Sequence, residues 1–229
     1  MEKSIRLNKA TSWYLFLLIA WIVCTTLALC MQSKPALFLA INHYRNSVLD
    51  IVATVFTCIG DGLFTLTLCA FFVFAKNRRL AWVLLCSFLL SALFCGILKN
   101  IADELRPAGY FKDTAMVKSV SWVSLKRFNS FPSGHTTSAF ATATVLAFYY
   151  KKVWLSFLFF LFALLVGYSR IYLGEHFVSD VFMGSIIGTL SSVLCILNHR
   201  SPVIRKGLGL EYLFKKKGMV DEQKQVSIF

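Results

Sequence analysis

The stretch FPSGHTTSAFATATVLAFYY, residues 131–150, decides the fold, because a polar start passes directly into an apolar run. From residue 136 onward the run is typical of a membrane helix, but as a helix it would reach only about 22 Å, against a hydrocarbon core of about 30 Å. We therefore expect the polar start to lie at or below the level of the lipid headgroups. The alternative is that the helix continues through Lys151 and Lys152, whose charged ends would reach back to water.

The rest of the chain fits the same class of protein. Of its 229 residues 57% are hydrophobic and 15% are charged, a composition typical of integral membrane proteins. Apolar segments able to cross a bilayer lie at residues 13–31, 48–75, 80–98, 136–150, 153–168 and 177–197. The sequence predicts an all-α bundle of six transmembrane helices over residues 1–198, followed by a basic tail at 199–229.

Two other interpretations of the basic residues are weaker. Three of them precede the first apolar segment, as in a signal peptide, but that segment is longer than a signal-peptide core, so we expect an uncleaved helix. The net charge of +13 is of the kind seen in nucleic-acid-binding proteins, yet most of it borders the spans and no nucleic-acid motif accompanies it. We expect a lipid bilayer as partner and no nucleic acid.

The distribution of positive charge predicts the orientation. The short loops at residues 76–79 and 151–152 are almost wholly basic, which the positive-inside rule assigns to the cytoplasm. Both termini are then cytoplasmic. The tail, with its lysines at residues 215–217, would rest on the anionic inner leaflet or act only as a basic stop-transfer anchor.

With this orientation, three polar clusters fall together at the outer ends of the spans, at residues 99–107, 132–135 and 169–180. Polar and ionisable groups at membrane depth are rare and usually functional. His176 and Asp180 are four residues apart at a helix start, so the carboxylate can hold one imidazole nitrogen and leave the other free to attack. The outer face is therefore the expected location of an active site.

The same clusters predict an anion site. Ser133 and Gly134 stand where a helix should begin, and the N-terminus of a helix offers unpaired N–H groups and a positive dipole end. Lys99, Arg106 and Arg170 add three cations suited to oxyanions. Carboxylate clusters for magnesium and the cysteine or histidine spacing of a zinc site are both lacking in the sequence, so we expect no metal and no other cofactor. The chemistry predicted is phosphoryl transfer through a histidine.

The three clusters resemble the signature of the type 2 phosphatidic acid phosphatase (PAP2) superfamily. The matching patterns are K-x6-R-P from Lys99, P-S-G-H ending at His135, and S-R-x5-H-x3-D ending at Asp180. The resemblance covers residues 50–195 and implies a lipid phosphatase of the bacterial inner membrane with its site facing the periplasm.

The resemblance also implies a role for each signature residue. His176 would be the nucleophile that forms a phosphohistidine, Asp180 would orient it, and His135 would protonate the leaving alkoxide. The phosphoryl oxygens would be held by Lys99, Arg106, Ser133, Gly134 and Arg170. Family members act on phosphatidylglycerophosphate, undecaprenyl pyrophosphate, lipid A phosphates and phosphatidic acid. A lipid-to-lipid phosphotransferase is the nearest alternative, and a scaffold or transporter that kept the fold is a more distant one.

Three features outside the signature have open interpretations. Asp61, between two glycines, would support the active site or, if residues 48–59 form an interfacial helix, mark the outer end of the second span. The loop at residues 108–131, rich in lysine and aromatic residues, would gate the substrate or simply lie on the membrane. Gly184 and Gly188 on the last span should allow close packing of helices.

Overall fold

The computed structural model describes residues 8–200, and every regular element in that range is a helix. The helices are α1 (Lys9–Met31), α2 (Lys34–Asn42), α3 (Ser47–Ile59), α4 (Gly62–Phe74), α5 (Arg78–Ala102), α6 (Pro107–Tyr110), α7 (Gly134–Tyr150), α8 (Val153–Tyr172) and α9 (Val178–Arg200), with a 3-10 turn at Thr114–Met116. The predicted all-α class is confirmed. The basic tail, from residue 201 on, lies outside the described residues.

Several long helices give the chain its membrane character. α1, α5, α8 and α9 are each long and apolar enough to cross a bilayer, and α3 with α4 would form one further span. α7, with 17 residues, is shorter than the roughly 20 residues that a span needs. The chain is a multi-pass membrane protein, and the count of six spans stays a prediction.

The second predicted span is broken into two helices. α3 and α4 meet at Gly60 and Asp61, where their axes bend by 56°. A Cβ atom at Gly60 would lie 2.3 Å from Cγ1 of Val166 on α8, so only glycine permits this close approach. Asp61 precedes the first turn of α4 in an extended conformation. The apolar segment at residues 48–75 predicted one continuous span, whereas the alternative of a separate helix over residues 48–59 that ends before Asp61 matches the break.

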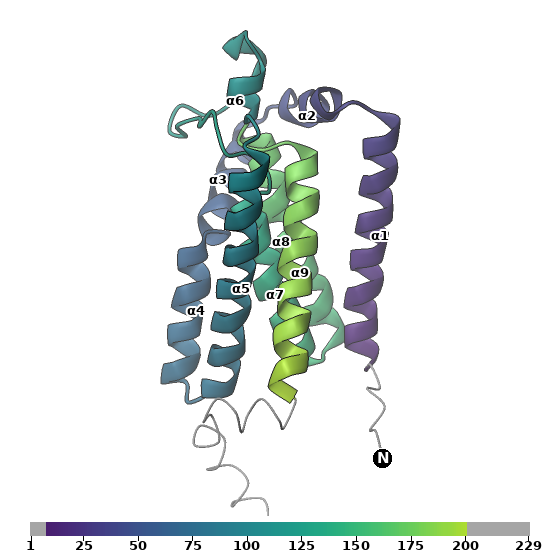
Figure 1. Cartoon of the computed structure of the whole chain (residues 1–229), viewed down its shortest axis with the longest axis vertical. Coiled ribbons are helices and arrows are strands. Elements are labelled where there is room, and N and C mark those ends of the chain that lie inside the picture. The colour runs from purple at the N-terminus through teal and green to yellow at the C-terminus, as the bar shows by residue number, and fades with distance from the viewer. Residues whose placement is uncertain (1–7, 201–229) are drawn as a thin grey trace, which may run out of the picture.

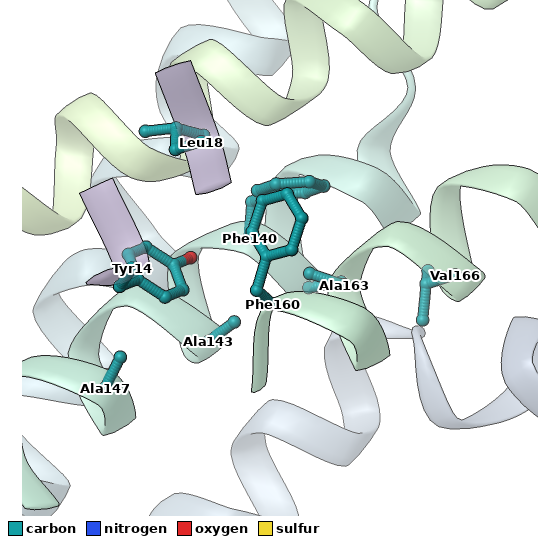
Figure 2. Packing of buried hydrophobic residues seen from close by; sticks show 9 residues of the cluster. Tyr14, Leu18, Phe140, Ala143, Ala147, Phe160, Ala163 and Val166 are labelled. Carbon is teal, nitrogen blue, oxygen red and sulfur yellow. The ribbon is translucent and has the colours of Figure 1, made fainter. Parts of the chain in front are cut away.

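α7 is the centre of the bundle and packs against α5, α8 and α9 (Figure 1). All of its residues from Thr136 to Ala147 are buried, and most of them are alanine, serine or threonine, which let neighbouring backbones come close. Figure 2 shows one side of this core, where Phe140 of α7 and Phe160 of α8 meet edge to face at 6.1 Å between ring centroids. Tyr14 of α1 joins them, with its hydroxyl 2.9 Å from that of Thr144.

The close packing predicted for Gly184 and Gly188 is confirmed. A Cβ atom at Gly184 would lie 2.8 Å from the carbonyl oxygen of Ser133, and one at Gly188 would lie 2.3 Å from that of Thr137. The backbones of α9 and α7 are therefore in direct contact. This contact fixes the start of α7 relative to the start of α9.

We expect Gly188→Ala to destabilise the protein by about 1–3 kcal/mol, because the added methyl group would push against the backbone of α7. Gly96→Ala on α5 is the matched control, since a Cβ atom there would meet nothing within 4 Å. Thermal unfolding in detergent, followed with a thiol-reactive dye on the buried cysteines, would measure both. Equal melting temperatures for the two variants would contradict close α7–α9 packing.

One end of the bundle is covered by α2, α6 and the connection that follows α6 (Figure 1). The start of α1 lies at the opposite end. Asn42, the last residue of α2, is buried and links α2 to the connection after α6 and to the end of α8. Its side chain donates to the carbonyl groups of Lys118 and Tyr172 at 2.7 and 2.9 Å and accepts a hydrogen bond from the Lys118 N–H. α2 was missed in the sequence because its nine residues follow directly on the first apolar segment.

Candidate active site

His176 and Asp180 are brought together, although not on one helix as their spacing predicted: α9 begins at Val178, and His176 lies in the connection before it. Both are buried at the junction of α8 and α9, and Nδ1 of His176 lies 3.2 Å from Oδ2 of Asp180. Because a carboxylate can only accept, Nδ1 carries the proton and donates it, which leaves the lone pair on Nε2. Nε2 is therefore the nitrogen available to attack an electrophile.

The buried surroundings of His176 favour the neutral form of its imidazole. Burial lowers the pKa of His176 to about 3, and this effect outweighs the hydrogen bond and charge of Asp180, which act in the opposite direction. A neutral imidazole is the nucleophilic form. His176 thus needs no base to remove a proton before it reacts.

Asp180 is held by more groups than the sequence suggested. Its Oδ2 also accepts hydrogen bonds from the Ser130 hydroxyl and, at 3.0 Å, from the backbone N–H of Phe177. Its Oδ1 accepts from Ser179 at 3.1 Å. Ser130 is fully buried and lies two residues before the P-S-G-H motif. The carboxylate can barely rotate, and the orientation of His176 is fixed with it.

The two arginines of the predicted anion site meet at a carboxylate that the sequence analysis missed. Glu175 Oε2 pairs with Nη1 of Arg106 and lies 3.3 Å from Nη2 of Arg170. All three side chains are buried. The structure therefore brings Arg106 and Arg170 to one point, although 64 residues of sequence separate them.

Arg170 keeps one donor free. Its Nη1 donates to Thr57 of α3 at 3.1 Å, whereas its Nε is buried without a hydrogen-bond partner among residues 8–200. Thr57 in turn contacts Ser169 at 2.9 Å between hydroxyl oxygens. A buried unpaired donor is costly, so the free Nε suits an anionic ligand.

The helix N-terminus predicted at Ser133 and Gly134 is present, with one difference. The backbone N–H of Ser133 donates to the carbonyl oxygen of Asp180 at 3.0 Å, so this group is already occupied. α7 begins at Gly134, and no side chain caps its first turn. A Cβ atom at Gly134 would meet nothing closer than Cys95 Sγ at 4.0 Å, which leaves space for a ligand in front of the turn.

Lys99 and His135 border the same region. Lys99 Nζ donates to the carbonyl oxygen of Asn129 at 2.7 Å, which joins the end of α5 to the segment before α7. His135 is partly buried and makes no hydrogen bond or ion pair within the described part of the chain, though it lies within electrostatic reach of Arg170 and Asp61. A histidine without a partner is free to exchange a proton with a ligand.

Asp61 is exposed at the start of α4 and forms no ion pair within residues 8–200. Its charge acts on both His135 and Arg170. A supporting role for Asp61 stays a prediction.

A further cation reaches the site from α2. Lys34 Nζ pairs with Glu104, lies 3.9 Å from Oδ1 of Asp180 and stands 4.7 Å above the ring of Phe177. Lys34 could not be selected from the sequence, because it looks like an ordinary charged residue after an apolar segment. Ser130 and Glu175 were missed differently: each is close to a motif, but only the fold reveals its partners.

The described residues place the buried imidazole of His176 beside converging cations and a helix N-terminus. Such an arrangement can bind a tetrahedral oxyanion and attack its central atom. The three predicted clusters lie from the end of α5 to the start of α6, at the start of α7, and from the end of α8 to the start of α9. They thus converge at one end of the bundle.

Curated relatives share part of this chain. An undecaprenyl-diphosphatase of Sulfolobus acidocaldarius is 28% identical over 136 residues, which cover 58% of this chain and 62% of the relative. A lipid A 4'-phosphatase of Bacteroides thetaiotaomicron is 34% identical over 125 residues, covering 50% of this chain and 55% of the relative. The chain thus matches less than two thirds of the length of either protein.

Solved structures match more completely. The crystal structure of Aquifex aeolicus LpxE superimposes with a TM-score of 0.62 at 32% identity, over 72% of this chain and 95% of that one. A transmembrane PAP2-type phosphatidylglycerolphosphate phosphatase of Bacillus subtilis gives a TM-score of 0.61 at 26% identity, over 79% and 93%. The family model of the PAP2 superfamily matches residues 80–202, which contain all three polar clusters. The chain therefore belongs to the PAP2 superfamily.

Proposed function

We propose that this protein is a membrane lipid phosphatase that works through a phosphohistidine. The observation that carries the proposal is the buried imidazole of His176, held at Nδ1 by Asp180 beside two buried arginines. The names of its relatives, lipid A phosphatases and undecaprenyl-diphosphatases, agree with this chemistry.

In the first step, Nε2 of His176 attacks phosphorus and the bond from phosphorus to the lipid oxygen breaks. Burial lowers the pKa of His135 to about 4, so His135 would take up its proton together with the phosphate dianion, whose charge favours the imidazolium. It then gives this proton to the lipid oxygen, so the lipid leaves as an alcohol or, from a pyrophosphate, as the lipid monophosphate. Asp180 balances the positive charge that develops on the imidazole. This step conserves charge without a metal ion.

In the second step, a water molecule attacks the phosphorus of phosphohistidine. His135, now neutral, takes a proton from the water, the bond from phosphorus to Nε2 breaks, and phosphate leaves. The residues that hold the phosphoryl oxygens in both steps would be Arg106, Arg170, Lys99, the Ser133 hydroxyl and the free N–H groups that begin at Gly134.

The substrates to be compared are phosphatidylglycerophosphate, undecaprenyl pyrophosphate, lipid A phosphates and phosphatidic acid. A lipid hydroxyl in place of water in the second step would make the protein a phosphotransferase. A scaffold or transporter would have no need of the His176–Asp180 pair, which makes the enzyme the better interpretation.

The proposed location is the bacterial inner membrane, with the site facing the periplasm and both termini in the cytoplasm. The basic loops at residues 76–79 and 151–152 join helices at the end of the bundle opposite the site (Figure 1). The positive-inside rule favours that end for the cytoplasm. The substrate phosphate would then be met at the outer leaflet.

Phosphate release by the detergent-purified protein in EDTA tests the proposal. We expect release from at least one of the four lipids, and none from a His176→Ala preparation purified in parallel, which reports contaminating host enzymes. Transfer of labelled phosphate to an added acceptor lipid, without release, would instead identify the phosphotransferase. Failure of both reactions with all four lipids would contradict the enzyme.

A further inference from the structure

We propose that Glu175 competes with the substrate phosphate for Arg106 and Arg170. Its carboxylate stands between the two guanidinium groups, paired with Nη1 of Arg106 and 3.3 Å from Nη2 of Arg170. A carboxylate and a phosphoryl group use the same guanidinium donors, because both present pairs of anionic oxygens. Glu175 would thus fill the place of the phosphate in the substrate-free protein. This inference rests on the proposed function of the site.

Burial explains why such a residue is needed. The exposed fractions are 8% for Arg106, 6% for Arg170 and 3% for Glu175, so none of these charges is well hydrated. Two buried guanidinium groups that converge without an anion would repel each other at low dielectric. Glu175 offsets this repulsion when the site is empty and keeps both arginines in place.

The same contact has a cost when phosphate binds. A phosphate dianion that approaches Arg106 and Arg170 meets the negative charge of Glu175, which must turn aside or remain as a repelling neighbour. Arg170 Nε, buried without a partner among residues 8–200, offers a donor that Glu175 does not use. The affinity for phosphate is therefore set below the value that the arginines alone would give.

Binding of inorganic phosphate to the full-length protein in detergent tests this inference directly. We expect Glu175→Gln to bind phosphate roughly tenfold more tightly or better, because the amide keeps the size of the side chain and an acceptor oxygen but removes the charge. Isothermal titration calorimetry would measure the dissociation constant. Unchanged or weaker binding by a folded Glu175→Gln protein would overturn the proposal.

A matched control separates this effect from a general change in charge. Asp103→Asn removes one negative charge at the same end of the bundle, where Asp103 is exposed and forms no ion pair within the described residues. Its backbone is left-handed, with φ of 40°, a conformation that asparagine also accepts. We expect its phosphate affinity to equal that of the unchanged protein. An equal gain in both variants would overturn the competition.

Glu175→Asp provides a second variant if Glu175→Gln does not fold. It keeps the charge but withdraws it by one methylene group, so phosphate binding should improve by a smaller factor. In turnover assays, KM should fall in the order of the measured phosphate affinities. Since phosphate binding needs no catalysis, these titrations test the competition by Glu175 even if no lipid is hydrolysed. If the protein hydrolyses a lipid but Glu175→Gln leaves the phosphate affinity unchanged, the competition is rejected and the proposed function stands.

Discussion

His176→Ala is expected to lower phosphate release by at least about three orders of magnitude, the largest effect of any single substitution. The variant loses the only atom, Nε2, that the proposed mechanism uses to attack phosphorus. The remaining cations can still bind the phosphate, so KM should change far less than kcat. Initial rates at saturating lipid, measured in EDTA, provide the comparison.

A second readout separates loss of the nucleophile from damage to the fold. Alkaline quenching of the unchanged protein during turnover of a phosphate-labelled lipid should trap label on His176, and the variant should trap none. His43→Ala is the control, because His43 is exposed at the end of α2, away from Asp180, and its imidazole Nε2 lies 3.1 Å from the Met116 carbonyl oxygen. Label retained by His176→Ala would refute the assignment of the nucleophile.

Asp180→Asn should lower kcat by roughly two to four orders of magnitude. Oδ2 of Asp180 accepts hydrogen bonds from Ser130, from the Phe177 N–H and from His176 at once. The asparagine amide has only one acceptor oxygen, whereas the carboxylate has two. If the amide nitrogen turned toward His176, it would favour the imidazole tautomer that has the lone pair on Nδ1. Nε2 would then carry a proton and could not attack.

Ser130→Ala gives the graded comparison for Asp180. It removes one donor but leaves the carboxylate and the His176 hydrogen bond, so we expect a fall of about tenfold or less. Melting temperatures of both variants would show whether folding has changed. Activity of Asp180→Asn within tenfold of the unchanged protein would reject the control of the His176 tautomer by Asp180.

The signature residues could be predicted from sequence because they lie at the ends of apolar segments. A spacing of four residues at a helix start was enough to predict the contact between His176 and Asp180, although His176 lies just before α9 and not on the helix itself. The role of Glu175 could not be found this way. Its two arginine partners come from α8 and from the segment before α6, and no local pattern links these positions.

The fold was predictable to a similar depth. Apolar length predicted the helices of the bundle, but only Asp61 between its two glycines pointed to the break at Gly60, and the close approach of Val166 of α8 to Gly60 could not be predicted. Apolar length also failed to predict α2 and predicted a connection there instead. Yet Lys34 of α2 lies 3.9 Å from Asp180. Contacts between distant segments decided both features.

The short length of α7 has a consequence for the kinetics. Its 17 residues rise about 26 Å, whereas the 25 residues of α5 rise about 38 Å, so the polar start of α7 need not reach the surface of the membrane. A lipid would then meet the site by lateral diffusion, with its tails still in the bilayer. The concentration that governs the rate would be the mole fraction of substrate among the lipids, and diluting it with inert lipid would slow the reaction even when the total amount of substrate is constant.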